Sequence, residues 1–569
     1  MLTKNGLSSH AGILPILSLA VIFLFINLGD VKLWQDEAET AMLARSVLKG
    51  GIPKAWDGKN LISSLNGADF NEDFIWTWHP WAQAYLTAIS FSFLGESNFS
   101  GRFPFALAGF LTIFFLYCLG LKLTGNRKIA LLSSLLLTIS LQFILYSRQC
   151  RYYSLLALFT VLILYSFYEL PGKKGMVLFI LSSALLFHSN FLPFFPTLFS
   201  LFVFLAVFER DREKVKSFFF CAVIIAFLTL PWLAYAKGLF HLKGFSELAG
   251  LLGKGGGASF LEQEIDLLKI VNATVFPLIM VLVAVILLFR TGTKHRKLYQ
   301  ALLILIIANL LFLPYITYTQ NIVGMRYSVG LIPVFCLLSS MIIAELLDYK
   351  RRIGVLIFLI IISTNILNSF PVVILKAFKG NFINNKRELN AEFEKMFLWK
   401  GNYFDFIYEL THHYEGPVNG IVKLLKEYGK ESEMVLTNYE SAAILFYTDL
   451  NLAYVISNNP DFYNSIPSGR YDSVLEKKLP PYVYTMEKVD WIIPRSNYND
   501  RLFNPEQVLR IMEEKGYRIK KYELDYPDLP WSNRADIRYH KFKSVKNFKK
   551  VVLYRVMQDK EGSGDFSRP

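Results

Sequence analysis

The sequence predicts a mainly α-helical, polytopic membrane protein that carries a C-terminal α/β domain on the outer face of the membrane. Two observations predict this fold class. Long apolar runs recur through residues 1–372, whereas from residue 373 to 569 short apolar segments alternate with polar ones. Across all 569 residues, 53% are hydrophobic and only 19% are charged, which is below the roughly 25% usual for soluble domains.

The same composition excludes several other classes of protein. A chain with 53% hydrophobic residues is neither disordered nor a disulfide-rich miniprotein. The net charge is +14, from 60 basic and 46 acidic residues. In a membrane protein such an excess reflects cytoplasmic loops and anionic lipid headgroups, so we expect membrane lipids and no nucleic acid as partners. The cysteines lie in or beside apolar runs without metal-binding spacing: Cys118, Cys150, Cys221 and Cys336.

Apolar runs long enough for membrane spans set the expected number of transmembrane helices. A spanning helix needs about 20 mostly apolar residues, and about 11 such helices are expected. The expected spans lie at residues 11–29, 103–122, 129–147, 153–170, 176–190, 191–208, 217–236, 271–289, 298–316, 328–347 and 353–371. The first could instead be a signal peptide, but it lacks a small-x-small cleavage site and runs straight into Asp30, which favours an uncleaved anchor.

The basic residues between these runs predict the orientation. With a cytoplasmic N-terminus, every short basic cluster falls on the cytoplasmic side, as the positive-inside rule requires. The protein is then a multi-pass protein of the plasma (inner) membrane. The loop 30–102 and the domain 373–569 lie on the outer, periplasmic side. The clusters are Arg127 and Lys128; Lys173 and Lys174; Arg210, Arg212, Lys214 and Lys216; Arg290, Lys294, Arg296 and Lys297; and Lys350 to Arg352.

The outer loop 30–102 is too long for a simple connector and belongs with the transmembrane domain 1–372. Its apolar and aromatic run from Trp81 to Leu94 predicts a helix lying in the membrane interface, with a twelfth span as the alternative.

The C-terminal domain shows strand and helix patterns in alternation. Strands are expected at Met434–Thr437, Leu452–Ile456, Trp491–Pro494 and Val551–Val556, and helices near Ser441–Tyr447 and Pro505–Lys515. The segment from Pro530 to Arg534 has side chains suited to sugar stacking and hydrogen bonding. Packing of this loop on its own domain is the simpler interpretation.

Candidate chemistry begins directly after the first apolar run. Trp34 and Gln35 precede two adjacent acids, Asp36 and Glu37, and the same loop carries His79 between aromatic residues. Acids at a membrane interface are commonly only solvated, but here apolar and aromatic residues flank them, which favours a functional role. These residues lack any familiar metal spacing, so no metal site is predicted, although a divalent cation stays open as a cofactor.

Arginines on the predicted outer side form the second set of candidates. Arg148 and Arg151 are three residues apart, followed by Tyr152, and Arg326 with Tyr327 precedes the tenth run. Because outer arginines run against the positive-inside trend, each needs a partner. That partner is either a phosphate, which arginine binds bidentately, or an acid of the first loop. Snorkelling is a further interpretation of Arg326 and the expected one for Arg102.

The order of these motifs resembles the GT-C superfamily of membrane glycosyltransferases. The resemblance rests on Trp-Gln-Asp-Glu-Ala at 34–38, Gly-Arg-Phe-Pro-Phe-Ala at 101–106, Arg-Gln-Cys-Arg-Tyr-Tyr at 148–153 and Arg-Tyr at 326–327. The chain is similar to the branch of protein O-mannosyltransferases and lipid A aminoarabinose transferases. Where the aminoarabinose branch commonly has Lys-Pro-Pro, this chain has His79-Pro80-Trp81, so the resemblance leaves the sugar and the acceptor undefined.

The resemblance implies transfer of a sugar, with inversion, from a polyprenyl-phosphate donor to a hydroxyl of a lipid, glycan or protein acceptor at the outer face. It implies Asp36 as the general base, with Glu37 binding the acceptor or orienting an arginine. Cations must hold the leaving phosphate. We assign this role to Arg148, Arg151 and Arg326 together with Tyr327, and we assign substrate contacts to Trp34, His79 and Tyr152.

Three rival functions remain for the same sequence. A transporter or flippase for a lipid-linked substrate would explain the many spans, although no internal repeat is visible. A glycan ligase or polymerase with a polyprenyl diphosphate donor would share the arginines. A non-catalytic scaffold would use the C-terminal domain for assembly. The absence of a P-loop, a nucleophile elbow and a dinucleotide-binding motif excludes ATP-driven, serine-hydrolase and NAD chemistry.

Overall fold

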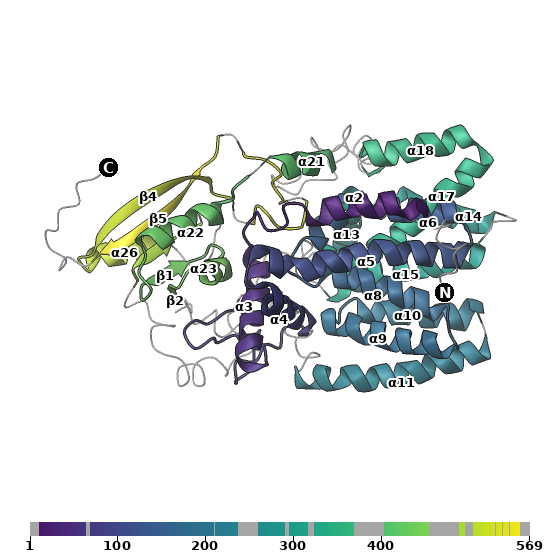
Figure 1. Ribbon diagram of the computed structural model, residues 1–569, viewed down its shortest axis with the longest axis horizontal. Helices are drawn as coiled ribbons and strands as arrows, with labels where there is room; N and C mark the ends of the chain where they lie inside the picture. Colours follow the sequence, from purple (N-terminus) through teal and green to yellow (C-terminus); the bar gives the residue numbers. More distant parts are fainter. Residues whose placement is uncertain are drawn as a thin grey trace.

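The protein consists of a helical bundle with an α/β domain at one end (Figure 1). This architecture comes from a computed structural model. It describes residues 11–63, 69–209, 211–236, 260–290, 295–316, 324–368, 403–412, 414–453, 489–495, 505–529, 531–537, 539–545 and 547–557.

Helices lie at all the positions where the apolar runs predicted them. The bundle contains the short helix η1 (Ala11–Ile13), α2 (Leu14–Phe25), α5 (Asn98–Thr124), α6 (Arg127–Thr138), α7 (Leu141–Ser147), α8 (Tyr153–Phe167), α9 (Lys173–Ser189), α10 (Phe194–Phe204), the π-helical turn η2 (Leu205–Glu209), α11 (Arg212–Tyr235), α13 (Phe260–Thr274), α14 (Ile279–Phe289), α15 (Arg296–Ile316), α16 (Gly324–Tyr327), η3 (Ser328–Leu331), α17 (Ile332–Tyr349) and α18 (Arg351–Ser363).

The length of these helices supports fewer membrane spans than the sequence predicted. Among the described residues, three helices are long and apolar enough to cross a membrane, or up to five if two bent pairs each form one span. The bent pairs are α6 with α7, at 64°, and α13 with α14, at 97°. Both were predicted as single spans. Non-helical backbone at membrane depth is stable where protein buries it or where it lines a cavity.

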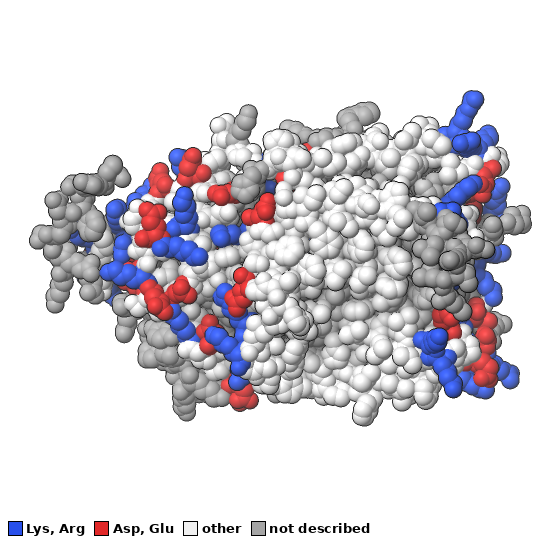
Figure 2. Space-filling view, viewed as in Figure 1, with Lys and Arg blue, Asp and Glu red and all other residues white. Residues whose placement is uncertain are grey.

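The short basic loops gather at one end of the bundle. Lys128 lies 3.9 Å from Asp348 and Lys297 lies 3.7 Å from Glu209, so loops far apart in the chain share this end. Figure 2 shows a broad uncharged face between two charged ends. A band without charges between polar ends is what a protein in a bilayer requires.

At the opposite end, the first long loop folds into two helices, α3 (Gln35–Gly50) and α4 (Ala82–Leu94). Helix α4 has 13 residues, about 20 Å of helix, and is too short to cross a hydrocarbon core of about 30 Å. It leaves Tyr85, Ile89 and Phe93 exposed. These features favour the predicted interface helix over a twelfth span.

The C-terminal domain is a five-stranded mixed sheet with helices packed against it. The strand order is β2-β1-β3-β5-β4, with β1 parallel to β2 and β3, and β5 antiparallel to β3 and β4. The elements are α21 (Tyr403–Thr411), α22 (Pro417–Tyr428), β1 (Met434–Thr437), α23 (Ser441–Tyr447), β2 (Asn451–Ala453), β3 (Trp491–Ile493), α26 (Pro505–Glu514), β4 (Arg518–Pro527) and β5 (Lys550–Met557).

The α/β domain packs directly on the first loop of the bundle. The side chain of Asn60 donates to the carbonyl oxygen of Leu450 at 3.1 Å and accepts from the amide of Leu452 at 2.8 Å. The Tyr447 hydroxyl accepts from the amide of Leu33 at 2.7 Å. These contacts hold the domain against the beginning of α3, where the candidate acids lie.

Candidate active site

Helix α3 positions the two predicted acids in its first turn. The extended backbone of Trp34 precedes the helix, and both carboxylates lie at its N-terminus, where unpaired amides and the helix dipole favour negative charge. The two side chains nevertheless differ in exposure. The side chain of Asp36 is 18% exposed, whereas that of Glu37 is fully buried.

Asp36 meets two of the predicted arginines. Its Oδ2 lies 3.0 Å from Nη1 of Arg326 and 3.9 Å from Nη2 of Arg151. Three segments far apart in the sequence therefore converge at the end of the bundle that carries the C-terminal domain, as their predicted common side required. The partner of Arg151 and Arg326 is, in this structure, an acid of the first loop.

The side chain of Arg151 is more buried than that of Arg326, with 6% against 17% exposed. Its Nη1 donates to Oε1 of Glu39 at 2.8 Å, to Oγ1 of Thr40 at 3.0 Å and to the carbonyl oxygen of Asp36 at 3.0 Å. Burial alone would lower the pKa of Arg151, but Glu39 and Asp36 raise it above its ordinary value. Among the described residues, its buried Nε has no hydrogen-bond partner, so this donor is available to a bound oxyanion.

Glu39 is supported from behind by His79. The Nε2 of His79 lies 3.7 Å from Oε1 of Glu39 and accepts from the indole of Trp76 at 3.2 Å. Gln83 contacts the same ring at 3.0 Å. Burial lowers the pKa of His79, which favours the neutral imidazole. The structure therefore places His79 in a supporting position behind the ion pair, not at an open face where a substrate could touch it.

Glu37, predicted as a second catalytic group, is occupied by protein contacts. Arg102 donates to its two carboxylate oxygens, from Nε and Nη2, each at 2.7 Å. The amide of Cys150 donates to Oε1 at 2.7 Å. Of the two predicted roles, the geometry favours orienting an arginine. It also corrects the interpretation of Arg102, which is not a snorkelling anchor but a buried partner of Glu37.

Arg148, predicted as a phosphate ligand, contacts backbone carbonyl groups in this structure. Its guanidinium donates to the carbonyl oxygens of Phe23, Ile26 and Asn27 at 2.9–3.2 Å. Phe23 lies in the last turn of α2, and Ile26 and Asn27 directly follow the helix, so none of these carbonyls has a partner within it. Arg148 therefore caps α2, and its neighbour in the motif, Arg151, is the arginine that reaches the acid cluster.

The predicted aromatic residues surround the cluster but are largely buried. Tyr152 is 2% exposed, Trp34 2% and Tyr327 8%. The indole N–H of Trp34 donates to Gln149, and the ring of Tyr152 lies beside His79 and Tyr153. Their positions suit a wall of the site better than an open stacking platform.

The C-terminal domain reaches the same site through Glu440. Its Oε2 accepts from the amide of Gln35 at 3.1 Å, and its Oε1 accepts from the amide of Trp531 at 2.6 Å. Burial raises the pKa of Glu440 to about 7. This carboxyl joins the first residue of α3 to the segment after β4.

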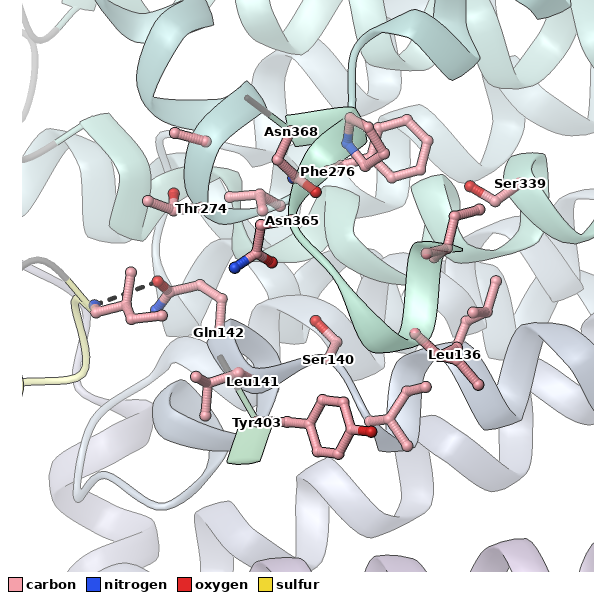
Figure 3. Close-up of a pocket in the computed structure, with 17 residues that line it drawn as sticks. Leu136, Ser140, Leu141, Gln142, Thr274, Phe276, Ser339, Asn365, Asn368 and Tyr403 are labelled. Atoms are coloured by element: carbon pink, nitrogen blue, oxygen red, sulfur yellow. Dashed lines mark hydrogen bonds between the residues drawn. The ribbon is translucent and has the colours of Figure 1, made fainter. Parts of the chain in front are cut away.

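A cavity of about 130 Å³ lies where the two bent helix pairs, α6 with α7 and α13 with α14, meet (Figure 3). Asn365, Ser140 and Tyr403 surround it, and Ile537 and Gln142 close one side with a hydrogen bond of 3.4 Å. None of its lining residues is charged, and none belongs to the acid–arginine cluster. Such a lining suits an uncharged part of a ligand.

In the part of the chain that the structure describes, no group of three or more His, Cys, Asp or Glu side chains could hold a metal ion. The cations that the site presents are its arginines.

Sequence reasoning missed three contributors: Glu39, Gln83 and Glu440. Glu39 had a signal, because a helix beginning at Gln35 places residues 36 and 39 on one face. The others come from segments whose approach to the site depends on tertiary packing.

Residues 78–235 match the family described as Dolichyl-phosphate-mannose-protein mannosyltransferase. This match confirms the predicted resemblance to GT-C membrane glycosyltransferases. It includes Arg151 but neither Asp36 nor Arg326, so the roles of those two residues rest on geometry.

Solved structures show the same fold over nearly the whole chain. ArnT from Cupriavidus metallidurans bound to undecaprenyl phosphate covers 95% of this chain and 97% of its own, with 12% identity and a TM-score of 0.54. The match to its apo form covers 96% of this chain and 98% of that chain, with 13% identity and a TM-score of 0.56. An uncharacterized protein of Aquifex aeolicus (strain VF5) is 24% identical over 234 residues, which span 40% of this chain and 44% of that protein, less than half of either.

Proposed function

We propose that the protein is an integral membrane glycosyltransferase that moves a sugar from a polyprenyl-phosphate donor to a hydroxyl group of a lipid, glycan or protein acceptor. The observation that carries this proposal is the convergence of Asp36, Arg151 and Arg326 at one end of an apolar bundle. The likeness to a transferase solved with undecaprenyl phosphate supports the donor class. The site then works at the outer face of the plasma (inner) membrane, as the basic loops at the opposite end indicate.

Asp36 is the group best placed to act as general base. Its Oδ2 faces Arg326, while among the described residues no hydrogen bond to Oδ1 is recorded, and its side chain is partly exposed. An acceptor hydroxyl that approaches Oδ1 can transfer its proton as its oxygen attacks the anomeric carbon. Attack from the face opposite the departing phosphate inverts the anomeric configuration.

The two arginines supply the charge that the leaving group needs. A phosphate monoester departs without a strong acid, but its growing negative charge must be held in a site poor in water. Among the described residues, Arg151 has a buried Nε without a hydrogen-bond partner, and the Arg326 guanidinium has one short ion pair, to Asp36. Fixed by Glu39 and Thr40, Arg151 is oriented before the substrate binds.

The uncharged cavity between the two bent helix pairs is our candidate for part of the prenyl chain. It is lined by apolar, amide and hydroxyl side chains, including Leu141, Phe276 and Asn365. Since it lacks charge, it cannot hold the phosphate. A lipid whose phosphate lies at the arginines could place its uncharged chain there.

The experiment compares Asp36→Asn with Asp73→Asn, a matched change at an exposed acid of the same loop. Asparagine keeps the size of aspartate but cannot accept the proton. We expect Asp36→Asn to reduce sugar transfer at least about 10²-fold with little change in polyprenyl-phosphate binding, and Asp73→Asn to be fully active.

The readout is radiolabelled sugar carried from a polyprenyl-phosphate donor into the acceptor fraction. Full activity of Asp36→Asn would remove Asp36 from the mechanism. Loss of donor binding in the same variant would assign Asp36 to arginine positioning. Movement of lipid-linked sugar across the membrane without a covalent product would instead establish the rival transporter.

A further inference from the structure

The segment 531–537 of the C-terminal domain lies on the bundle beside the candidate site. The side chain of Gln149 donates to the carbonyl oxygen of Asn533 at 3.2 Å, and that of Gln142 donates to the carbonyl oxygen of Ala535 at 2.6 Å. The amide side chain of Asn533 in turn donates to the carbonyl oxygen of Lys32. The segment is therefore fixed at both ends against α7, its following turn and the approach to α3.

Arg534 occupies the middle of this docked segment. Its guanidinium carbon lies 5.4 Å from the ring centre of Trp34, 5.6 Å from that of Trp531 and 5.2 Å from that of Tyr539. These distances are typical of cation–π contacts, which hold a guanidinium in place and leave its N–H groups free to donate.

Arg534 differs from the other cations of the site in its partners. Arg151 and Arg326 each face a carboxylate within 3.0 Å. No ion pair or side-chain hydrogen bond of the Arg534 guanidinium is recorded within the described residues, and the nearby acid Asp536 is buried and engaged in another contact. Arg534 is half-buried, so its charge is less screened than on an open surface.

Arg534 also shares its electrostatic neighbourhood with the catalytic cluster. The hydroxyl of Tyr153 interacts electrostatically with Asp36, Arg151, Arg326 and Arg534. Trp34, which contacts Arg534, lies two residues before Asp36. The cation of the C-terminal domain and the paired cations of the bundle thus lie around the same aromatic residues, Trp34 and Tyr153.

From these contacts we infer that Arg534 binds the phosphate of the lipid-linked donor, so that the C-terminal domain completes a site whose other cations come from the bundle. The inference rests on the proposed function and deepens it. Arginine donates to phosphate through two parallel N–H groups, and an arginine without a carboxylate partner binds an incoming anion without first breaking an ion pair. Glu440 contributes indirectly, since it joins Trp531 to Gln35 and holds the segment in place.

The test measures binding of polyprenyl phosphate and of the uncharged polyprenol to the full-length protein in nanodiscs. The variants are Arg534→Gln, Arg534→Lys and, as a matched control, Arg518→Gln at an exposed position of β4. We expect Arg534→Gln to raise the Kd for polyprenyl phosphate by about 10- to 100-fold, the range for loss of a hydrogen bond to a charged group. Arg534→Lys should recover part of the affinity, and polyprenol binding and the control should not change.

Every other result would overturn the inference, and each would point to a different role for Arg534. Equal Kd values for wild type and Arg534→Gln would show that Arg534 does not touch the phosphate. An equal loss for polyprenol would assign Arg534 to packing of the segment. An increase in the KM of the acceptor alone would place an acceptor anion there. If wild type itself does not prefer polyprenyl phosphate to polyprenol, the proposed function fails, and not Arg534 alone.

Discussion

Variants of the ion pair between Glu39 and Arg151 can separate effects on stability from effects on sugar transfer. Both side chains are almost fully buried, with 3% and 6% exposed, and their closest atoms are 2.8 Å apart. Glu39→Leu leaves the Arg151 charge buried without its main partner, and Arg151→Met leaves Glu39 in the same state. We expect each single change to lower the free energy of unfolding by about 3–5 kcal/mol.

The double variant Glu39→Leu/Arg151→Met removes both charges and replaces them with apolar side chains of similar size. Because the uncompensated charge is the main source of the loss, we expect the double variant to lie within about 1 kcal/mol of wild type. Activity should behave differently. The double variant should fold yet transfer sugar at least about 10²-fold more slowly, since one of the cations that serve the leaving phosphate is gone.

The assay is equilibrium unfolding in mixed micelles for the four proteins of the cycle, alongside the radiolabel transfer assay. Additive losses in the double variant would mean that Glu39 and Arg151 are not coupled as the structure shows. A double variant with wild-type activity would contradict the proposed role of Arg151 in catalysis and leave it a structural residue.

Two further predictions test the electrostatics around the site. Burial raises the pKa of Glu440 from its ordinary value of 4.5 to about 7 in the folded protein. The native state therefore binds more protons between these pH values, and stability falls as the pH rises through them, by at most about 3 kcal/mol. Glu440→Gln should remove this slope, so the difference in Tm between variant and wild type should grow from pH 5 to pH 8, and a constant difference would contradict it. Arg148→Gln should lower Tm, because it uncaps α2, while the Kd for polyprenyl phosphate stays as in wild type; a weaker Kd at unchanged Tm would restore the predicted phosphate contact.

The sequence predicted most of the secondary structure because hydrophobic patterning is a local property. The helix predicted at Ser441–Tyr447 and the strand at Met434–Thr437 have those bounds in the structure. Strand β4 was missed because it is an edge strand whose outward positions are charged or polar, as at Lys520, Lys521 and Glu523. It therefore shows no apolar run.

The sequence predicted the positions of the helices better than the positions of the bends within them. The run at 129–147 is apolar throughout, yet the chain turns by 64° between α6 and α7. Part of the reason is close packing of the second piece: a Cβ atom at Gly109 would lie 2.7 Å from Ser147, so the absent side chain lets α5 approach the end of α7. Composition alone does not record such an approach.

In the candidate site, too, the sequence predicts which residues share one end of the bundle, but not which side chains they contact. Alternating spans predict that residues 36, 151 and 326 share one end of the bundle, and they do. They do not predict which acid each arginine meets, because that choice depends on the rotation of each helix about its axis. Arg102 and Arg148 both lie within reach of the same end, yet one pairs with Glu37 and the other caps α2. Residue type narrows the candidates to a few arginines and acids. Only the packing of the helices decides that both carboxylate oxygens of Glu37 accept hydrogen bonds, whereas among the described residues Oδ1 of Asp36 accepts none.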